Sequence, residues 1–435
     1  MLKLNELNKY FNKEVCIQGF VDKVRDLQYV QFLILRDGDD KIQVTIEKNE
    51  ENERLNDIVS SLTLESTVKV SGKVLESPNV KLNGMEIIPT DIIVTSKSLE
   101  ELPVNIQKKD ATSRDTRLDY RFLDLRRSEN YLLFKCQTLL EKAMRDYFVE
   151  KGYIEIHSPK ISESNAESGA EQFKVDYFGK EASLVQSPQF YKQMGIASGL
   201  GSVFEVGAVY RAENSNTAVH ATEFHGFDVE MGFINGVDDV MDEEEAWIKY
   251  FLKALKDEYE EQIQKTFKVD IPNLEVDFPR LTFDEVKEIM RTEYKYDAEK
   301  KDDLDSKEEK LICKYVKKKY DSDFVFVTNY PYSARSFYVM KDENGVTQTY
   351  DLLFRGVEIT SGAQREHRPD ILEKQIKEKE LDPKDLDFYI NFFRYGCPPH
   401  GGFGVGLERV MMCIFNIDNI REVEFVYRGP TRLTP

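Results

Sequence analysis

The sequence predicts an α+β protein of more than one domain, in which an N-terminal β-barrel precedes a larger antiparallel sheet flanked by helices. Residues 1–102 are rich in β-forming residues and hold five candidate strands with short turns between them. Residues 203–233 read as two further strands around a polar loop, because apolar side chains alternate there. Apolar residues recur instead at helical spacing in 132–150 and 237–264. Strands alone, followed by strands mixed with long helices, are typical of an α+β chain with separate domains.

The bulk composition limits the class of protein. With 60 Lys and Arg against 79 Asp and Glu, the 435-residue chain has a formal net charge of −19, which taken alone disfavours nucleic-acid binding. No apolar run reaches the length of a membrane span, and the first residues lack the basic-then-apolar order of a signal peptide. The five cysteines include no C-x-x-C pair, so we expect free thiols, no zinc site and a cytoplasmic protein.

The predicted domain order is a barrel, a hinge and a large second domain. In residues 1–102 a polar, helical stretch separates the third strand from the fourth, which predicts an OB-fold that binds single-stranded nucleic acid. Residues 103–130 form the hinge, whose five arginines either contact phosphates or pair with aspartates of the same run. Residues 131–435 form the second domain, in which the charge-rich stretch at about 270–325 is expected to be an insertion with a solvated surface.

Two residues of the barrel are candidates for reading a base. Phe32 offers a ring on which a base can stack, and Gln43 offers an amide that can read a base edge. The pattern alone also allows a core Phe and a surface Gln at these positions.

The hairpin 203–233 has one polar face. In a regular return strand, His220, Phe224, Asp228 and Glu230 lie on the same side, opposite an apolar face. A half-solvated hairpin explains the alternation. It explains less well why cationic, acidic and aromatic side chains gather there, because cations suit phosphates and a ring suits a nucleotide base.

The octapeptide Q-S-P-Q-F-Y-K-Q, residues 186–193, predicts the start of a helix. Ser187 is the expected N-cap residue and Pro188 the expected first helical residue. Gln189 and Lys192 are three residues apart, so we expect them to project from one face of this helix.

Three stretches complete the second domain. A strand is predicted at 323–331, followed by a hairpin over 336–354 that turns at Asn344-Gly345. The next stretch brings Glu358 near Ser361, and a carboxylate with a hydroxyl can hold Mg²⁺. In the last stretch, 398–415, glycines let a ligand approach the backbone, and Arg409 falls on the first turn of a helix that follows.

Together these stretches resemble the class II aminoacyl-tRNA synthetases. The helix and strand that lead to Pro159, the R-A-E and H-A-T-E-F stretches of the hairpin, and the G-x-G-x-G-x-E-R sequence that ends at Arg409 are similar to the three motifs of that class, in the same order. Q-S-P-Q-F-Y-K-Q, H-G-F-D-V-E-M and the terminal R-L-T-P are similar to aspartyl-tRNA synthetases of the archaeal and eukaryotic type, in subclass IIb. The resemblance covers essentially the whole chain and implies a class II catalytic domain beside the OB-fold.

The resemblance also implies a reaction. ATP and aspartate would give aspartyl-adenylate and pyrophosphate, and the aspartate would then be transferred to the terminal ribose of tRNA-Asp. Whether tRNA-Asn is charged as well stays open. A homodimer built on the unit around Pro159, and Mg²⁺ held by Glu358 and Ser361, are further implications.

Site residues are carried over from the resemblance one by one. The expected catalytic residues, which would neutralise phosphate charge, are Arg211 and Arg409. The residues expected to bind ATP are Arg211, Glu213, His220, Phe224, Glu358, Gly406 and Arg409. Those expected to bind aspartate are Glu167, Gln189, Lys192, Arg211, Asp228, Ser361 and Arg365, with Lys192 and Arg365 as a doubly cationic pocket for its side chain. In the barrel, Phe32 and Gln43 would contact the central anticodon base.

Two departures from the family pattern and four alternatives remain. Ser168 stands where the family usually has Gly, and Val219 where it often has Arg. Asparaginyl- and lysyl-tRNA synthetases share the scaffold, although a doubly cationic pocket favours aspartate. An AMP-forming asparagine synthetase would lack the barrel, and a non-catalytic tRNA-binding relative should have lost Arg211, Glu358 or Arg409.

Overall fold

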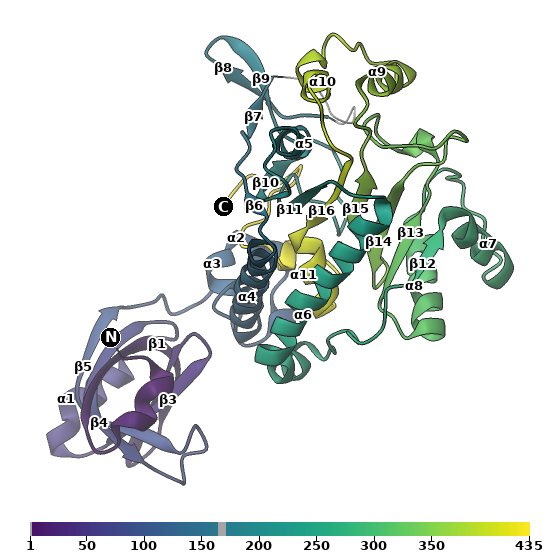
Figure 1. Ribbon diagram of the computed structural model, residues 1–435. Coiled ribbons are helices and arrows are strands. Elements are labelled where there is room, and N and C mark those ends of the chain that lie inside the picture. Colours follow the sequence, from purple (N-terminus) through teal and green to yellow (C-terminus); the bar gives the residue numbers. More distant parts are fainter. Residues whose placement is uncertain (1, 164–170) are drawn as a thin grey trace. The chain divides into compact units, whose positions relative to one another are not determined.

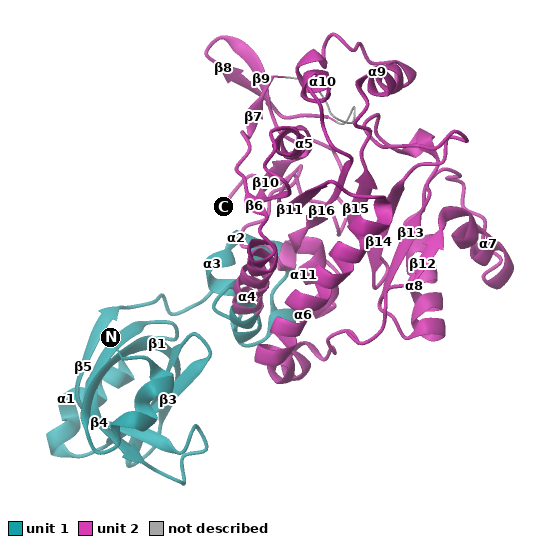
Figure 2. Ribbon diagram, in the orientation of Figure 1, with its two compact units in different colours: residues 1–132 teal, residues 133–435 magenta. Residues whose placement is uncertain are grey.

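The computed structural model describes residues 2–163 and 171–435, which form two compact units, 1–132 and 133–435 (Figure 2). Glu167 and Ser168, both singled out in the sequence, lie outside the described residues. Among the described residues, no helix is both long and apolar enough to cross a membrane.

The first unit contains a closed five-stranded barrel, as the sequence predicts. Its strands pair in the order β1-β2-β3-β5-β4, and a short helix, α1, lies between β3 and β4. Alternate residues of each strand point inward, among them Leu33 and Leu35 of β2, and form one apolar core. The bounds are β1 Glu14–Asp26, β2 Val30–Asp37, β3 Asp40–Glu47, α1 Glu53–Ser60, β4 Thr67–Glu76 and β5 Met85–Ser96.

Residues 103–130, the predicted hinge, contain two short α-helices, α2 (Arg114–Asp119) and α3 (Arg121–Asp124), and three of the five arginines pair with one aspartate. Asp124 is fully buried, and the guanidinium of Arg121 lies 2.5 Å from its carboxylate. Arg117 and Arg127 approach the same carboxylate at 3.4 and 3.7 Å. For these three buried arginines, the structure therefore shows the pairing alternative rather than a surface for phosphates.

The second unit is built on an eight-stranded sheet with the order β12-β13-β14-β15-β16-β11-β10-β6 (Figure 1). All neighbours are antiparallel except the two edge pairs, β12–β13 and β6–β10. The bounds are β6 Ile154–Glu155, β10 Val203–Tyr210, β11 Glu223–Gly232, β12 Arg280–Thr282, β13 Phe324–Thr328, β14 Thr349–Phe354, β15 Val357–Gln364 and β16 His400–Gly406. A small sheet, β7-β9-β8, adds β7 Ile161–Ser162, β8 Lys174–Tyr177 and β9 Lys180–Leu184.

Two long helices, α4 and α6, cover one face of the large sheet, and aromatic rings fill the space between (Figure 1). The ring of Phe148 on α4 lies 5.6 Å from Phe204 and 5.4 Å from Trp247 on α6, centroid to centroid. Phe227 and Phe403 of the central strands join the same cluster. The helix bounds are α4 Ser128–Glu150, α5 Gln189–Ala197, α6 Val237–Phe267, α7 Phe283–Glu293, α8 Ser306–Tyr320, α9 Pro369–Glu378, α10 Asp387–Arg394 and α11 Leu407–Phe415. This apolar face leaves the opposite face of the central strands for polar residues.

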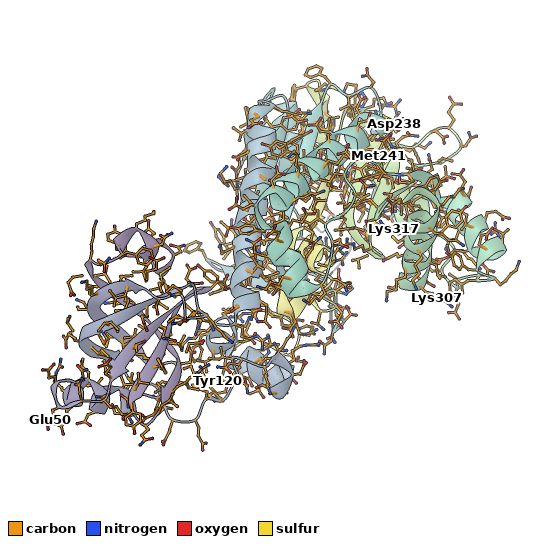
Figure 3. The ribbon with its side chains drawn as sticks, turned by 90° about the horizontal axis from the view of Figure 1, so that it is seen from below. Glu50, Tyr120, Asp238, Met241, Lys307 and Lys317 are labelled. Carbon is orange, nitrogen blue, oxygen red and sulfur yellow. The ribbon has the colours of Figure 1, made fainter. Side chains whose placement is uncertain are left out.

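The charge-rich segment 270–325 contributes to the sheet as well as to the surface. It supplies the edge strand β12 and the helices α7 and α8, whose apolar side chains pack on β13. Arg280 of β12 donates to Asp238 in the first turn of α6 at 3.0 Å. Lys307 and Lys317 lie near the two ends of α8, on its exposed side (Figure 3).

The predicted hairpin over 336–354 is wrong in its first half. Only Thr349–Phe354 forms a strand, β14, and it pairs with β13 on one side and β15 on the other. A strand has two edges, so none is left for 336–340. Residues around Gly345 still turn, but they form isolated bridges such as Lys341 with Thr347.

Candidate active site

A cavity of about 410 Å³ opens on the polar face of the central strands. The strand register explains why polar residues meet there. Glu205 of β10 stands opposite Asp228 of β11, which stands opposite Gly404 of β16, and Ser361 and Asp351 continue the same row. Residues in register point to one face, so this row places carboxylates and a hydroxyl from four of its five strands on the same side of the sheet.

The glycines of β16 make room for carboxylates of the neighbouring strand. A Cβ added to Gly404 would lie 2.8 Å from the Asp228 carboxylate, and one added to Gly402 would lie 2.5 Å from that of Glu230. Gly406 also lines the cavity, and a Cβ there would meet only the Arg409 side chain, at an ordinary 3.9 Å. At the first two positions, glycine is therefore required by the protein's own atoms rather than by a ligand: by the Asp228 carboxylate at Gly404, and by the Val229 carbonyl and the Glu230 carboxylate at Gly402.

Four charged side chains form a network at one end of the cavity. Glu230 is fully buried; its carboxylate accepts from Arg365 at 3.0 and 3.3 Å and lies 3.4 Å from the Lys192 ammonium. Lys192 donates to Asp228 at 3.1 Å and to two backbone carbonyls, those of Val229 and Phe403. Although burial opposes it, the charges of Arg365 and Lys192 hold the pKa of Glu230 below its ordinary value.

This network corrects the expectation of a doubly cationic pocket. Lys192 and Arg365 both line the cavity, but Glu230 neutralises part of their charge before any ligand binds. Lys192 already makes three hydrogen bonds, which is all that an ammonium can donate. Arg365 uses Nε and Nη2 for Glu230 and the Gly402 carbonyl, so its Nη1 is the better placed group for a ligand.

Helix α5 brings Gln189 and Lys192 to the cavity, although it begins one residue later than predicted. Pro188 occupies the N-cap position and Gln189 is the first helical residue. The Ser187 hydroxyl still accepts a hydrogen bond from the backbone N–H of Gln189 at 3.2 Å, so Ser187 contacts the start of the helix although it is not the N-cap residue. Both Gln189 and Lys192 are buried and line the cavity, as their spacing leads one to expect.

The opposite end of the cavity is cationic and aromatic. Its lining includes Arg211, Glu213, His220, Phe224 and Arg409, five residues that the sequence analysis selected. The Arg211 guanidinium lies 5.3 Å from the centre of the Phe224 ring. Arg409 donates to the Glu358 carbonyl at 3.0 Å and to the Val219 carbonyl at 3.4 Å. The contact at Val219 is made by its backbone carbonyl, and the Val219 side chain carries no charge for a phosphate.

His220 lies in the loop that follows β10 rather than in β11, where the regular hairpin would have placed it. Its Nδ1 bonds to the Thr217 hydroxyl. Burial and the charges of Arg409 and Arg211 lower its pKa, which Glu213 opposes. The ring is therefore neutral at neutral pH and can donate from its other nitrogen.

A β-bulge brings Glu358 and Ser361 to the same face. Residues three apart in a regular strand point to opposite faces. Here Leu353 stands opposite Glu358 and Leu352 opposite Thr360, so Ile359 is an extra residue and the parity changes. Glu358, Ser361 and Asp351 consequently share the cavity side of the sheet.

The oxygen atoms of this group fit a divalent cation. Burial, and then the charge of Asp351, raise the pKa of Glu358 to about 7, while Arg409 and Arg335 oppose the rise. Asp351 pairs with Arg335 at 2.6 Å, and Ser361 accepts from the same guanidinium at 3.4 Å. Two neighbouring carboxylates and a hydroxyl are hard ligands, and a cation would relieve the repulsion that raises this pKa.

In the first unit, Phe32 and Gln43 share the outer face of the barrel. Phe32 points away from the core and is half-buried, which excludes the core-Phe alternative. Both residues line a groove of about 1020 Å³ on β2 and β3. The Gln43 amide nitrogen donates to Thr45 at 3.1 Å and to Glu86 at 3.3 Å, which leaves its carbonyl oxygen for the groove.

Some site residues were missed in the sequence. Asp351 sits in the otherwise apolar T-Y-D-L-L-F, and an acidic residue in a buried strand was a usable signal. Glu230 was noted only as part of a polar face, because nothing in the sequence connects it to Arg365, 135 residues away. Gln193 was quoted as the end of an octapeptide, and its partner His400 is 207 residues away.

Two family profiles match the chain. The profile described as "tRNA synthetases class II (D, K and N)" matches residues 113–426, and the one described as "OB-fold nucleic acid binding domain" matches residues 15–95.

Similar proteins are found among curated sequences and solved structures. An "Aspartate--tRNA(Asp) ligase" of Pyrococcus horikoshii is 40% identical over 99% of this chain and 98% of its own length. An "Aspartate--tRNA(Asp/Asn) ligase" of Aeropyrum pernix is 38% identical over 97% of this chain and 95% of its own. The crystal structure of an asparaginyl-tRNA synthetase from Pyrococcus horikoshii, complexed with asparaginyl-adenylate, matches with a TM-score of 0.91 at 30% identity, covering 98% of this chain and 97% of that one.

Proposed function

The chain belongs to the class II tRNA synthetases of the D, K and N type, and we propose that within this family it is an aspartate–tRNA ligase. It would activate aspartate with ATP to aspartyl-adenylate and pyrophosphate, and then transfer the aspartate to tRNA.

The charge balance of the buried network is the observation that carries the choice of aspartate. Lys192 and Arg365 bring two positive charges against the carboxylates of Glu230 and Asp228. Once the α-ammonium of the substrate pairs with Asp228, one positive charge is left for a further anion. Arg365 would bind the substrate's side-chain carboxylate, and the positive charge of Lys192 would stabilise that carboxylate without a direct hydrogen bond. The amide of asparagine would leave the extra positive charge uncompensated in a buried site.

The other charged groups of aspartate also find opposite charges. Asp228 lines the cavity beside Lys192 and would accept from the α-ammonium group, together with Gln189. Arg211 would bind the α-carboxylate and the α-phosphate of ATP, and so stabilise the charge that develops on the phosphate during attack. Glu167 stays a proposed ligand of the ammonium end, carried over from the resemblance.

The cationic and aromatic end would bind the nucleotide. Phe224 would stack on adenine, Glu213 would accept from its amino group, and Arg409 would cover the base from the other side and reach the γ-phosphate. A neutral His220 would donate to the same phosphate. The backbone at Gly406 would lie close to the nucleotide. No side chain forms a covalent bond in this scheme, because catalysis rests on positioning and on neutralised charge.

Mg²⁺ would be held by Glu358 and Ser361. Bound there, it would neutralise charge on the phosphates of ATP. Asp351 lies in register with Ser361, and both of its carboxylate oxygens accept from Arg335. The raised pKa of Glu358 supports this proposal, since a carboxyl that resists ionisation gains from a nearby cation.

The barrel would bind the anticodon of tRNA. Phe32 would stack on the central base, and the carbonyl oxygen of Gln43, which Glu86 and Thr45 turn toward the groove, would accept from it. The tRNA is tRNA-Asp in this proposal, with tRNA-Asn as the open addition. A homodimer through the region of Pro159 is proposed as well, and exposed Val149, Ile154 and Ile161 around it support a covered surface. A cytoplasmic location stays a prediction.

Pyrophosphate exchange tests the proposal. We expect ATP–pyrophosphate exchange with aspartate, and rejection of asparagine by roughly 10⁴, the discrimination of a site built for one polar group. Comparable exchange with asparagine would overturn the choice of amino acid and favour an asparaginyl-tRNA synthetase. Charging of purified tRNA-Asp and tRNA-Asn with aspartate then decides whether one or both are substrates.

A further inference from the structure

A chain of buried side chains leads from β16 to the amino-acid end of the cavity. Gln193 donates from Nε2 to Nε2 of His400 at 2.8 Å, and its Oε1 lies 2.8 Å both from the Tyr389 hydroxyl and from Nε2 of Gln189. His400 Nδ1 lies 2.9 Å from the Pro398 carbonyl. All three inner members, Gln193, Tyr389 and His400, are fully buried.

The Pro398 carbonyl fixes the direction of every bond in this chain. A carbonyl can only accept, so His400 carries its proton on Nδ1 and its Nε2 must accept. Gln193 must therefore present its amide nitrogen to His400 and its oxygen to the other side. That oxygen requires donors, so Gln189 presents its nitrogen to it, and the carbonyl oxygen of Gln189 is turned toward the cavity that this residue lines.

Adding a proton to His400 would reverse the chain. Nε2 would then donate, and Gln193 would have to turn its oxygen to meet it. The Gln193 nitrogen would face Gln189, which would turn its own oxygen inward and its amino group toward the cavity. A cavity that offers an acceptor to a substrate ammonium would then offer a donor instead.

We propose that Gln193, His400 and Tyr389 are positioning residues that keep Gln189 turned as an acceptor for the α-ammonium of the amino acid, and that protonation of His400 weakens amino-acid binding. This inference rests on the proposed function, because it takes the ligand at Gln189 to be an amino acid.

The surroundings of His400 keep it neutral. Burial lowers its pKa, and the charges of Arg365 and His367 act in the same direction, while Glu230 and the Pro398 carbonyl oppose them. The Cys397 sulfur lies 3.7 Å from Nδ1, and the Phe393 ring stacks on the imidazole at 5.9 Å. The acceptor arrangement is therefore the one present at neutral pH, and acid is needed to reverse it.

The test is the pH dependence of the KM for aspartate in ATP–pyrophosphate exchange, between pH 5.5 and 8.5 at saturating ATP. In the wild-type protein we expect this KM to rise by up to tenfold per pH unit once His400 begins to protonate, with a smaller change in kcat. Glu358 and His220 titrate at the nucleotide end, so their protonation should appear in the KM for ATP, which is measured in parallel.

Variants distinguish an effect transmitted through the hydrogen bonds of His400, Gln193 and Gln189 from a general effect of acid on the protein. In His400→Gln, an amide oxygen can replace Nε2 as the acceptor and cannot titrate, so the acid rise in the aspartate KM should disappear. Gln193→Met removes the link and should raise the aspartate KM at all pH values without an acid rise. Tyr389→Phe removes one donor and should raise it severalfold with the acid rise kept. The matched control is His157→Gln, an exposed histidine that does not act on His400, which should keep the wild-type profile.

The outcomes are distinct. A flat aspartate KM in the wild-type protein would overturn the inference, as would an unchanged acid rise in His400→Gln or Gln193→Met. Either variant suffices if the other does not fold. Absence of any aspartate-dependent exchange in the wild-type protein would instead overturn the proposed function.

Discussion

The groove on the barrel and the cavity on the sheet both collect polar residues, but those residues differ in what they contact before a substrate arrives. In the groove, Phe32 is half-buried on an open surface, and Gln43 bonds only through its nitrogen. In the cavity, Lys192, Glu230 and Arg365 are buried and already bound to one another. The groove holds separate contact points, whereas the cavity holds a network.

This difference predicts how substitutions act. Removing a side chain from an open groove costs the ligand contact and little stability, because water replaces the lost partner. Removing one member of a buried charged network leaves the others without compensation, so stability and binding fall together. Measurements on the two regions should therefore separate folding, amino-acid activation and tRNA charging.

The largest effect is expected at the nucleotide end of the cavity. Arg211→Ala and Arg409→Ala should lower aspartate-dependent ATP–pyrophosphate exchange by about 10⁴ or more, about 5.5 kcal/mol, since each removes a charge that stabilises the reacting phosphates. Neither residue belongs to the buried network, so urea unfolding should be nearly unchanged. Exchange close to the wild-type rate in either variant would contradict the assigned roles.

A substitution within the network should affect folding as well. Glu230→Gln keeps the shape of the side chain but leaves Lys192 and Arg365 with an excess of buried positive charge. We expect the free energy of unfolding to fall by about 3–5 kcal/mol, as for other buried pairs that lose one partner. Exchange with aspartate should weaken in the same variant.

Glu213→Gln is the matched control for this change, because Glu213 also lines the cavity but is outside the network. It should leave the free energy of unfolding unchanged. Equal stability of Glu230→Gln and the wild-type protein would show that the network does not hold the cavity together.

The two regions also differ in how far the sequence predicts them. The alternation of apolar and polar residues in β2 predicts that Phe32 lies on the outer face of the barrel, and the same alternation in β11 predicts the face on which Asp228 lies. Strands and their faces can therefore be predicted from neighbouring residues in the sequence. The bulge at Ile359 is not visible in the sequence, because it depends on how β15 pairs with β14. The pairing of Glu230 with Arg365 depends on the contact of distant strands, and charge counting alone gave a pocket that was too positive.

The groove should respond to substitution in binding only. Phe32→Ala should weaken tRNA binding by about 1–3 kcal/mol, the value of one base stacked on an aromatic ring. Exchange without tRNA should stay at the wild-type rate, and Tyr29→Ala in the same groove serves as a comparison for a ring that is mostly exposed. Impaired exchange with normal tRNA affinity would reverse the assignment of the two regions.

The smallest effect is expected at Arg421. This residue combines features of the two regions, because it is partly exposed like the groove residues but has several hydrogen-bond partners like the residues of the cavity. Its Nη1 donates to the Thr217 carbonyl at 3.0 Å, its Nη2 donates to Asn216, and its guanidinium lies 4.5 Å from the Tyr427 ring. These contacts fix the loop that carries His220.

Arg421→Ala should therefore raise the KM for ATP about fivefold, which corresponds to about 1 kcal/mol, the net value of a typical hydrogen bond. The KM for aspartate should not change, since the loop lies at the nucleotide end. Arg421→Lys keeps the charge but not the planar fork, so it should recover only part of the affinity for ATP. Arg394→Ala, which removes two exposed ion pairs, one within α10 and one to α9, is the matched control and should change neither constant. If Arg421→Ala raised both KM values equally, Arg421 would support the fold as a whole rather than the loop.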